Sequence, residues 1–323
     1  MTPKERAIAA LTLKQPDQVP TFELEFQLAQ EMFGINLNPP KLQHGEIHKL
    51  SQLEKEQALD AHAQDIAHVY TALDYSIIPG LYGIGHDHFS NGKMSFEMKF
   101  LIDKIMEYTG GTRMLGYHAD GTFAIPDGNA MYDFAYQMAD EPEELLKRAQ
   151  TDATAAIERN KILAENGVEV GLLCSDYCYN NGPFLSPANF GVFIQPFLAQ
   201  IIEEAKKAGM YTIKHCDGDI MPIIDQMVDC NPHALHSIDP MAGVDIKLVK
   251  EKYGHKVAIC GNVHCAAMQT GTDEEVIAST EYCLTHGKPG GGYIFCTSNV
   301  PFKGMPAHRY QMILDIWKSM RDY

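Results

Sequence analysis

The run Met210-Tyr-Thr-Ile-Lys-His-Cys-Asp-Gly-Asp-Ile220 brings an imidazole and a carboxylate to the end of an expected strand. His215 and Asp217 are two residues apart, so at a strand end their side chains leave on the same side. An imidazole beside a carboxylate suits either a metal site or a base with its orienting acid. A plainer interpretation stays open, in which Asp217 caps a helix expected over residues 219–229 beside an incidental histidine.

Polar residues also follow most of the other expected strands. Short apolar runs alternate with amphipathic stretches along the chain, which favours βα units on a parallel sheet. In a closed α/β barrel, the residues just after each strand gather at one rim, where active sites are built. Besides His215 and Asp217, the residues expected at this rim are Glu23, Glu25, Asp176, Tyr177, Asp239, Asn262, His264 and Cys296.

Each of these rim residues has a structural interpretation that stays open as well. Glu23 and Glu25 could form a solvated edge. Asp176 could cap a turn, and Asp239 could start one because a proline follows it. His264 could be a loop residue with satisfied hydrogen bonds, and Cys296 could be an ordinary core residue.

The alternation predicts a single α/β domain over residues 1–323, a (β/α)8 TIM barrel. A β-hairpin region inserted at about residues 86–133 is expected, because four turn dipeptides, Asn91-Gly92 among them, punctuate alternating segments there. The expected helices cover residues 3–13, 46–72, 141–166, 187–208, 219–229, 243–253, 273–287 and 306–321. The expected strands cover residues 19–25, 75–79, 168–174, 210–216, 233–238, 256–260 and 292–296.

Composition excludes several classes of function. The 323 residues are 45% apolar, which is enough for a full core, and the net charge of -16 argues against a nucleic-acid partner. No apolar run is long enough to span a membrane, and the first residues lack the apolar core of a signal peptide. Eight cysteines without close spacing predict reduced thiols in a cytoplasmic protein. The glycine pattern of a dinucleotide-binding fold is missing.

An ordered set of motifs resembles the uroporphyrinogen decarboxylase superfamily, over essentially the whole chain. The resemblance implies a single (β/α)8 barrel. The motifs are Pro3-Lys-Glu-Arg-Ala-Ile-Ala-Ala-Leu11, Pro16-Asp-Gln-Val-Pro20, Gly182-Pro-Phe-Leu-Ser-Pro187, His215-Cys-Asp-Gly218, Gly261-Asn262 and Gly290-Gly-Gly-Tyr-Ile294.

Two departures indicate which branch of the superfamily the chain resembles. The decarboxylases proper grip the propionates of their substrate with an arginine-rich segment, whereas this chain has the acidic Thr21-Phe-Glu-Leu-Glu-Phe-Gln27. In the zinc-dependent, corrinoid-linked methyltransferases that act on coenzyme M, His-x-Cys follows the corresponding strand and another Cys follows the last one. In this chain His215 matches the His of that pattern, and Asp217 stands in place of the first Cys. Cys296 lies a few residues before the position of the second Cys, and Asn299 is nearer to that position. The chain is more similar to the first methyltransferase of O-demethylase systems.

This resemblance implies transfer of a methyl group from an O-methyl donor, expected to be a phenyl methyl ether, to the Co(I) corrinoid of a separate corrinoid protein. Zinc would assist, held by His215 and Asp217 with Asp239 and Cys296 as further ligands. The expected catalytic residues are Asp176, Glu23, Glu25 and His264. The expected substrate contacts are Phe22, Tyr177, Tyr179 and Asn262, and the rings of the three aromatic residues would pack on the donor.

Three other functions stay open at this stage. One is a methylcorrinoid-to-thiol transferase of the coenzyme M type, in which Cys296 would be an essential ligand. Another is a uroporphyrinogen-decarboxylase-like decarboxylase, and the third is a non-enzymatic corrinoid- or tetrapyrrole-binding protein. A homodimer also stays open as the oligomeric state.

Overall fold

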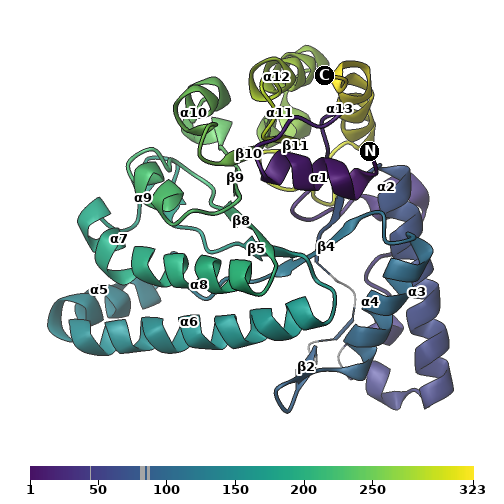
Figure 1. Ribbon diagram of the computed structural model, residues 1–323, viewed down its shortest axis with the longest axis horizontal. Coiled ribbons are helices and arrows are strands. Elements are labelled where there is room, and N and C mark those ends of the chain that lie inside the picture. Colours follow the sequence, from purple (N-terminus) through teal and green to yellow (C-terminus); the bar gives the residue numbers. More distant parts are fainter. Residues whose placement is uncertain (44, 81–83, 86–87) are drawn as a thin grey trace.

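A curved parallel sheet forms the centre of the computed structural model, which describes residues 1–323 except 44, 81–83, 86 and 87 (Figure 1). Within the described residues the sheet has seven strands in the order β1-β4-β5-β8-β9-β10-β11. Strand neighbours follow the chain order, as in a TIM-type barrel. The strands are β1 (Ile77–Ile78), β4 (Met114–His118), β5 (Val170–Leu173), β8 (Tyr211–His215), β9 (Ala234–His236), β10 (Ala258–Val263) and β11 (Tyr293–Thr297).

Helices cover the outside of this sheet, because parallel neighbours need long crossover connections. Figure 1 shows α6 and α8 along one side and α10, α12 and α13 near the last strands. None of the described helices is both long and apolar enough to span a membrane. The longer helices are α1 (Pro3–Leu11), α3 (Gln52–Ala72), α4 (Phe96–Tyr108), α5 (Ala130–Asp140), α6 (Pro142–Glu165), α8 (Gln195–Lys207), α10 (Ile246–Tyr253), α12 (Asp273–Gly287) and α13 (Ala307–Met320). The shorter ones are α2 (Ala29–Phe33), α7 (Pro187–Phe193), α9 (Ile224–Asp229) and α11 (Cys265–Thr270).

The two edges of the sheet both hydrogen bond to the segment around Thr21. Thr21 forms a parallel bridge with Phe295 of β11. Its carbonyl oxygen accepts a hydrogen bond of 2.8 Å from the backbone nitrogen of Ser76, just before β1. The strand expected over residues 19–25 is therefore present only as this single bridge, and the predicted eight-stranded barrel is confirmed in its seven-stranded part.

The region at about 86–133 is not the insertion of hairpins that its turn dipeptides predicted. One short hairpin does form, between β2 (Phe89–Ser90) and β3 (Lys93–Met94). The chain then continues the α/β alternation through α4, β4 and α5. Ser95 begins α4 by accepting a hydrogen bond from the backbone nitrogen of Met98, a capping signal that the glycine-containing turns obscured. Residues 86 and 87 lie outside the described residues.

A second correction concerns the helix expected over residues 219–229. The helix α9 begins only at Ile224, and a turn precedes it in which Asp219 accepts from the backbone nitrogen of Met221. Asp217 therefore lies seven residues before the helix and cannot cap it. The interpretation of Asp217 as a helix cap is wrong, which leaves its carboxylate free for another task.

A buried ion pair joins the carboxyl ends of three neighbouring strands, β4, β5 and β8. The Lys214 side chain has no exposed surface, and its Nζ donates to Oδ2 of Asp120 at 3.0 Å. The same Nζ donates to the carbonyl oxygens of Ser175 at 2.8 Å and Leu173 at 3.3 Å. The ammonium also lies 4.0 Å from the centre of the Tyr177 ring. Lys214 of β8 thereby holds the segments that follow β4 and β5.

The carboxylate of Asp120 is fully engaged in this arrangement. Its Oδ1 accepts from the backbone nitrogens of Gly121 and Thr122, and its Oδ2 accepts from that of Ser175. Burial alone would raise the pKa of Asp120, but Lys214 and these hydrogen bonds lower it to about 2. The pair is therefore charged throughout the neutral range.

We predict that Asp120→Asn destabilises the protein by about 3–5 kcal/mol, because it leaves the Lys214 ammonium buried without a counter-charge. Asp17→Asn is the matched control, since Asp17 pairs with Arg6 at a site where 41% of its side chain is exposed. Such a surface pair contributes only about 0–1 kcal/mol. Urea unfolding measures both variants, and a loss for Asp120→Asn no larger than that of the control would contradict the assignment.

Glu23 is a second buried charge-bearing group, placed where the sheet edges meet. Its carboxylate accepts from the backbone nitrogen of Thr297 at 3.1 Å and from the hydroxyl of Tyr310 at 3.3 Å. Burial raises the pKa of Glu23 to about 8, although these hydrogen bonds oppose the rise. A group whose folded pKa is raised stabilises the fold below its unfolded pKa, and that contribution is lost as pH rises through the folded value.

We therefore predict that the free energy of unfolding falls between about pH 4.5 and 8 relative to that of Glu23→Gln, which cannot ionise. Each pH unit in this window changes stability by up to about 1.4 kcal/mol. Urea unfolding of both proteins at several pH values measures the difference. Parallel pH profiles for the two proteins would refute the prediction.

Candidate metal centre

Three side chains from two strand ends meet at one point. His215 is the last residue of β8 and Asp217 follows it, while Asp176 lies in the segment after β5. The Nε2 atom of His215 lies 3.4 Å from Oδ1 of Asp176 and 3.7 Å from Oδ1 of Asp217. One ligand atom from each residue lies within 4.8 Å of the other two, which is close enough to hold one metal ion.

The Asp217 carboxylate is oriented by its neighbours and keeps one oxygen unused. Its Oδ2 accepts a hydrogen bond from Nδ2 of Asn299, and its backbone nitrogen donates to Oδ1 of Asp176 at 3.0 Å. Its Oδ1 is buried and has no hydrogen-bond partner in the described part of the chain. A buried carboxylate oxygen without a partner is costly, so this atom calls for a cation or a donor from outside the chain.

The His215 ring is fixed by a second histidine from the next strand. The sheet register places His236 of β9 beside His215, and their Nδ1 atoms are 2.8 Å apart. When Nδ1 of His215 carries the proton of this contact, Nε2 keeps its lone pair toward the two carboxylates. Histidine ligands in metal sites are commonly oriented in this way by a partner on the far ring nitrogen.

The electrostatics of the group also favour a cation. Burial, helped by the charges of Lys214 and His118, lowers the pKa of His215 to about 3, so its ring is neutral at neutral pH. Burial and the Asp176 carboxylate raise the pKa of Asp217 to about 7. Two carboxylates and an imidazole lone pair thus converge, and among the described residues no lysine or arginine forms an ion pair with either carboxylate. A divalent cation would relieve their mutual repulsion.

This set of donors fits zinc. One imidazole nitrogen and two carboxylate oxygens make three protein ligands, the number in catalytic zinc sites that keep a fourth position open for substrate or water. Oxygen and nitrogen ligands leave the ion more electrophilic than thiolates would. The fit rests on the unpartnered Asp217 Oδ1 and on the types of the donor atoms.

Gly218 fixes the two ligand-bearing segments against each other. It has φ +82°, and a Cβ on it would lie 2.5 Å from the carbonyl oxygen of Tyr179 and 2.6 Å from that of Cys178. The backbone nitrogen of Asp219 donates to the same Tyr179 carbonyl at 2.9 Å. Only glycine permits this close approach, which holds Asp176 and Asp217 on facing segments.

A pocket of about 300 Å³ adjoins the three-residue group. Asp217 and Asn299 form part of its polar wall, and Met241, Val300 and Phe302 form much of its apolar wall. A small ligand with an apolar ring and one polar atom would fit such a lining.

Two expected metal ligands lie outside the three-residue group. Asp239 has its oxygens engaged, because Oδ2 accepts from the backbone nitrogen of Gly218 and Oδ1 from that of Met241. Cys296 is fully buried and lies inside β11, which ends one residue later than expected. The residues that follow β11 toward the mouth are therefore Ser298 and Asn299.

The expected catalytic residues are distributed over several places. Asp176 belongs to the three-residue group, although the sequence suggested it as an acid and not as a ligand. Glu23 is bound to Thr297 and Tyr310 at the junction of the sheet edges. Glu25 lines a separate cavity, and His264 is half-buried just before α11.

Most of the expected substrate contacts are enclosed in the protein. Phe22 is fully buried and packs edge-on against His236. Tyr177 is fully buried against Lys214 and Phe190, so its ring has no face open to a ligand. The Asn262 amide donates to the carbonyl oxygen of Ile238. Of these residues only Tyr179, with 46% of its surface exposed, could meet a molecule from outside.

Sequence reasoning missed two residues that shape the centre, and it named Asn299, two residues after β11, without giving it a role at the metal. His236 stands at the end of β9 as His215 does at the end of β8, and this parallel position could have revealed it. Lys214 is a lone cation inside an otherwise buried strand, which usually signals a buried counter-charge nearby.

A search of curated protein sequences gives no significant match. Similar solved structures include N-acetylneuraminate lyase from Fusobacterium nucleatum, with 12% identity over 81% of this chain and 70% of that one, and a TM-score of 0.40. D-psicose 3-epimerase from Clostridium cellulolyticum H10 has 9% identity over 84% and 94% of the two chains, with a TM-score of 0.45. A sugar phosphate isomerase/epimerase from Parabacteroides distasonis has 10% identity over 83% and 91%, with a TM-score of 0.43. Similarities of this size say nothing about activity or substrate.

A family model carries more weight than these structures. The model described as uroporphyrinogen decarboxylase (URO-D) matches residues 127–319, which is more than half of the chain and includes all three residues of the candidate metal centre. The motifs read from the sequence and the curved parallel sheet agree with this match. The chain belongs to the uroporphyrinogen decarboxylase family.

Proposed function

We propose that this chain is a zinc-dependent methyltransferase that moves a methyl group from an aromatic methyl ether to the Co(I) corrinoid of a separate protein. The observation that carries the proposal is the group of Asp176, His215 and Asp217, in which a buried carboxylate oxygen has no partner among the described residues. An oxygen-rich site of this kind suits the polarisation of an oxygen atom.

The difficult part of the reaction is the departure of the oxygen. The bond between the methyl carbon and the ether oxygen breaks as the cobalt electron pair forms the new bond to carbon, and the oxygen keeps the bonding pair as a phenolate. A zinc ion held by Asp176, His215 and Asp217 would supply positive charge beside that oxygen. Water then provides the proton that converts the phenolate to the phenol.

The chain's own residues would hold and orient the methyl donor. The pocket beside Asp217 can take an aromatic ring against Met241, Val300 and Phe302. The ether oxygen would then face Asp217 and Asn299, at the polar end of the pocket. The contact with His236 would fix the tautomer and orientation of the neutral His215 ring, with Nε2 directed at the metal position.

The other reactions that the sequence left open find less support at this site. Activation of a thiol would need Cys296, which is buried inside β11 and outside the three-residue group. Decarboxylation of a polycarboxylate would need cations at the mouth. The side chains described at this group are carboxylates and imidazoles, and the nearby Lys214 is neutralised by Asp120.

We predict that the purified protein binds one zinc ion per chain. Asn299→Ala removes a residue that orients a ligand and should weaken zinc binding by roughly 10- to 100-fold. His215→Ala and Asp217→Asn each remove a ligand and should weaken zinc binding by more than that. Asp219→Asn is the matched control, because it removes the same charge two residues from Asp217.

Competition with a chromophoric chelator and elemental analysis measure the affinity and the content. Full zinc affinity in His215→Ala would rule out this ligand set. An equal loss in Asp219→Asn would mean that net charge, and not coordination, accounts for the effect.

The second prediction concerns the reaction. With an aromatic methyl ether as donor, the chain alone should release no phenol, because it offers no acceptor for the methyl group. Addition of Co(I) cobalamin, or of a corrinoid protein in the Co(I) state, should give phenol and methylcorrinoid in equal amounts, followed by absorbance. Phenol release without any corrinoid would contradict the proposal.

Two further arms of that assay separate the alternatives. Methylcobalamin with a thiol tests the reverse type of transfer, and a tetrapyrrole carboxylate tests decarboxylation. Asp217→Asn should abolish ether demethylation while the protein remains folded, since Asp217 contributes little to the core. Activity in either alternative arm that exceeds ether demethylation would reassign the enzyme within its family.

A further inference from the structure

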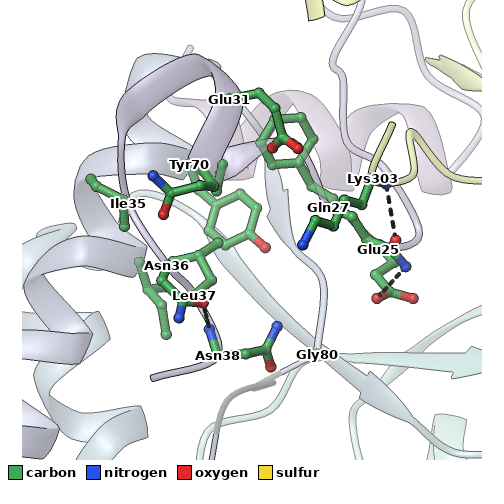
Figure 2. Close-up of a pocket in the computed structure, with 14 residues that line it drawn as sticks. Glu25, Gln27, Glu31, Ile35, Asn36, Leu37, Asn38, Tyr70, Gly80 and Lys303 are labelled. Carbon is green, nitrogen blue, oxygen red and sulfur yellow. Dashed lines mark hydrogen bonds between the residues drawn. The ribbon is translucent and has the colours of Figure 1, made fainter. Parts of the chain in front are cut away.

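A second cavity, of about 440 Å³, shares no lining residue with the candidate metal centre, and Figure 2 shows the residues that line it. It is formed by the segment after Thr21, by α2 and the loop that follows it, by α3, and by the loop after β11. None of the three residues of the metal centre lines it. The reaction proposed above makes no use of this cavity.

The hydroxyl of Tyr70 is the most informative group in the cavity. Tyr70 is only 4% exposed as a residue, and its side chain lines the cavity. Figure 2 shows its hydroxyl directed into the open space of the cavity, toward the side where Gln27 and Lys303 lie. No hydrogen bond of this hydroxyl is present among the described residues, so it is open to a ligand that donates or accepts a hydrogen bond there.

A half-buried carboxylate lies within electrostatic range of that hydroxyl. Glu25 accepts one hydrogen bond, from Nε2 of Gln27 at 3.0 Å, and Gln27 is itself held by the backbone nitrogen of Lys303 at 3.2 Å. Burial raises the pKa of Tyr70, and the charge of Glu25 adds to the rise. An ionised carboxylate has room for several donors, so Glu25 can accept further hydrogen bonds from a ligand.

The charges around the cavity favour a positive ligand. Glu25 is half-buried, whereas Glu31 and Lys303, the other charged residues of the described lining, are both exposed at the rim. Among the described residues none of these three charged groups forms an ion pair. Phe26 and Leu37 supply apolar wall between the charges. Because Glu31 and Lys303 are exposed and of opposite charge, the partly buried Glu25 carboxylate makes the interior negative, with apolar surface beside it.

We propose that this cavity binds a small organic ammonium ion with an apolar body. The ammonium group would donate hydrogen bonds to the Glu25 carboxylate and to the Tyr70 hydroxyl, and the apolar body would pack on Phe26 and Leu37. Charge-assisted hydrogen bonds of this kind are about twice as strong as neutral ones. The site is separate from the metal centre, so binding there does not depend on zinc or on the proposed reaction.

The test uses three probes of similar size and different charge on the purified protein. Benzylammonium, benzyl alcohol and benzoate are titrated by calorimetry and by ligand-observed NMR. Benzylammonium should bind with a Kd in the millimolar range, as expected for a fragment of this size, and the other two more weakly. Removal of zinc with a chelator should leave this binding unchanged, which distinguishes the cavity from the metal centre.

Two variants locate the binding, each with a matched control. Glu25→Gln removes a charged hydrogen-bond acceptor and should weaken the binding of benzylammonium by at least about tenfold. Tyr70→Phe removes a neutral hydrogen-bonding group and should weaken that binding by about fivefold. Glu143→Gln removes the same charge in the exposed first turn of α6, and Tyr253→Phe removes a hydroxyl bonded to Asp225; neither should change the affinity.

The proposal is overturned if benzoate or benzyl alcohol binds as tightly as benzylammonium. It is also overturned if Glu25→Gln changes the affinity no more than Glu143→Gln does, or if benzylammonium does not bind at tens of millimolar. Because Tyr70 makes no hydrogen bond through its hydroxyl in the described residues, Tyr70→Phe should fold normally, and its thermal midpoint should equal that of the wild type within a few degrees.

Discussion

The buried ion pair between Lys214 and Asp120 is the interaction on which the mouth of this molecule depends. Lys214 directly precedes His215 in β8, and its ammonium holds the segments that follow β4 and β5. Asp176 belongs to the second of these segments, so the lysine that is fixed by Asp120 also fixes the position of a carboxylate of the candidate metal centre. A charge inside a core must be fully coordinated to be tolerated. That requirement leaves the strand ends little freedom and sets the geometry of the centre before any ion binds.

Two ionic environments therefore lie side by side in β8. Around Lys214 each charge has its counter-charge and its hydrogen bonds. Around His215 the balance is incomplete, because Asp176 and Asp217 face a neutral imidazole and one carboxylate oxygen has no partner among the described atoms. The first arrangement is structural, and the second is a group of residues that could hold a cation. The family to which the chain belongs fits this division, since an α/β barrel carries stability in its core and chemistry at its strand ends.

The sequence predicted the α/β alternation and most strand positions, because apolar runs and helix signals are local. The strands that contain His215 and Cys296 were placed within a residue or two. That small error mattered at Cys296, which lies inside β11 and not after it. The hairpin insertion at about 86–133 was wrong because glycine turns do not distinguish a hairpin from the end of a helix. The sequence did not predict the ion pair between Lys214 and Asp120 or the contact between His215 and His236, because contacts between distant residues depend on the register of the sheet.

The central claim is that a metal ion is held by nitrogen and oxygen atoms of Asp176, His215 and Asp217. X-ray absorption spectroscopy at the zinc edge of the purified protein tests it most directly, because sulfur scatters differently from nitrogen and oxygen and lies farther from zinc, at about 2.3 Å against about 2.0–2.2 Å. The account predicts a first shell of nitrogen and oxygen alone, with the outer-ring signal of one imidazole. A sulfur in the first shell would bring Cys296 or another cysteine to the metal and contradict the assignment.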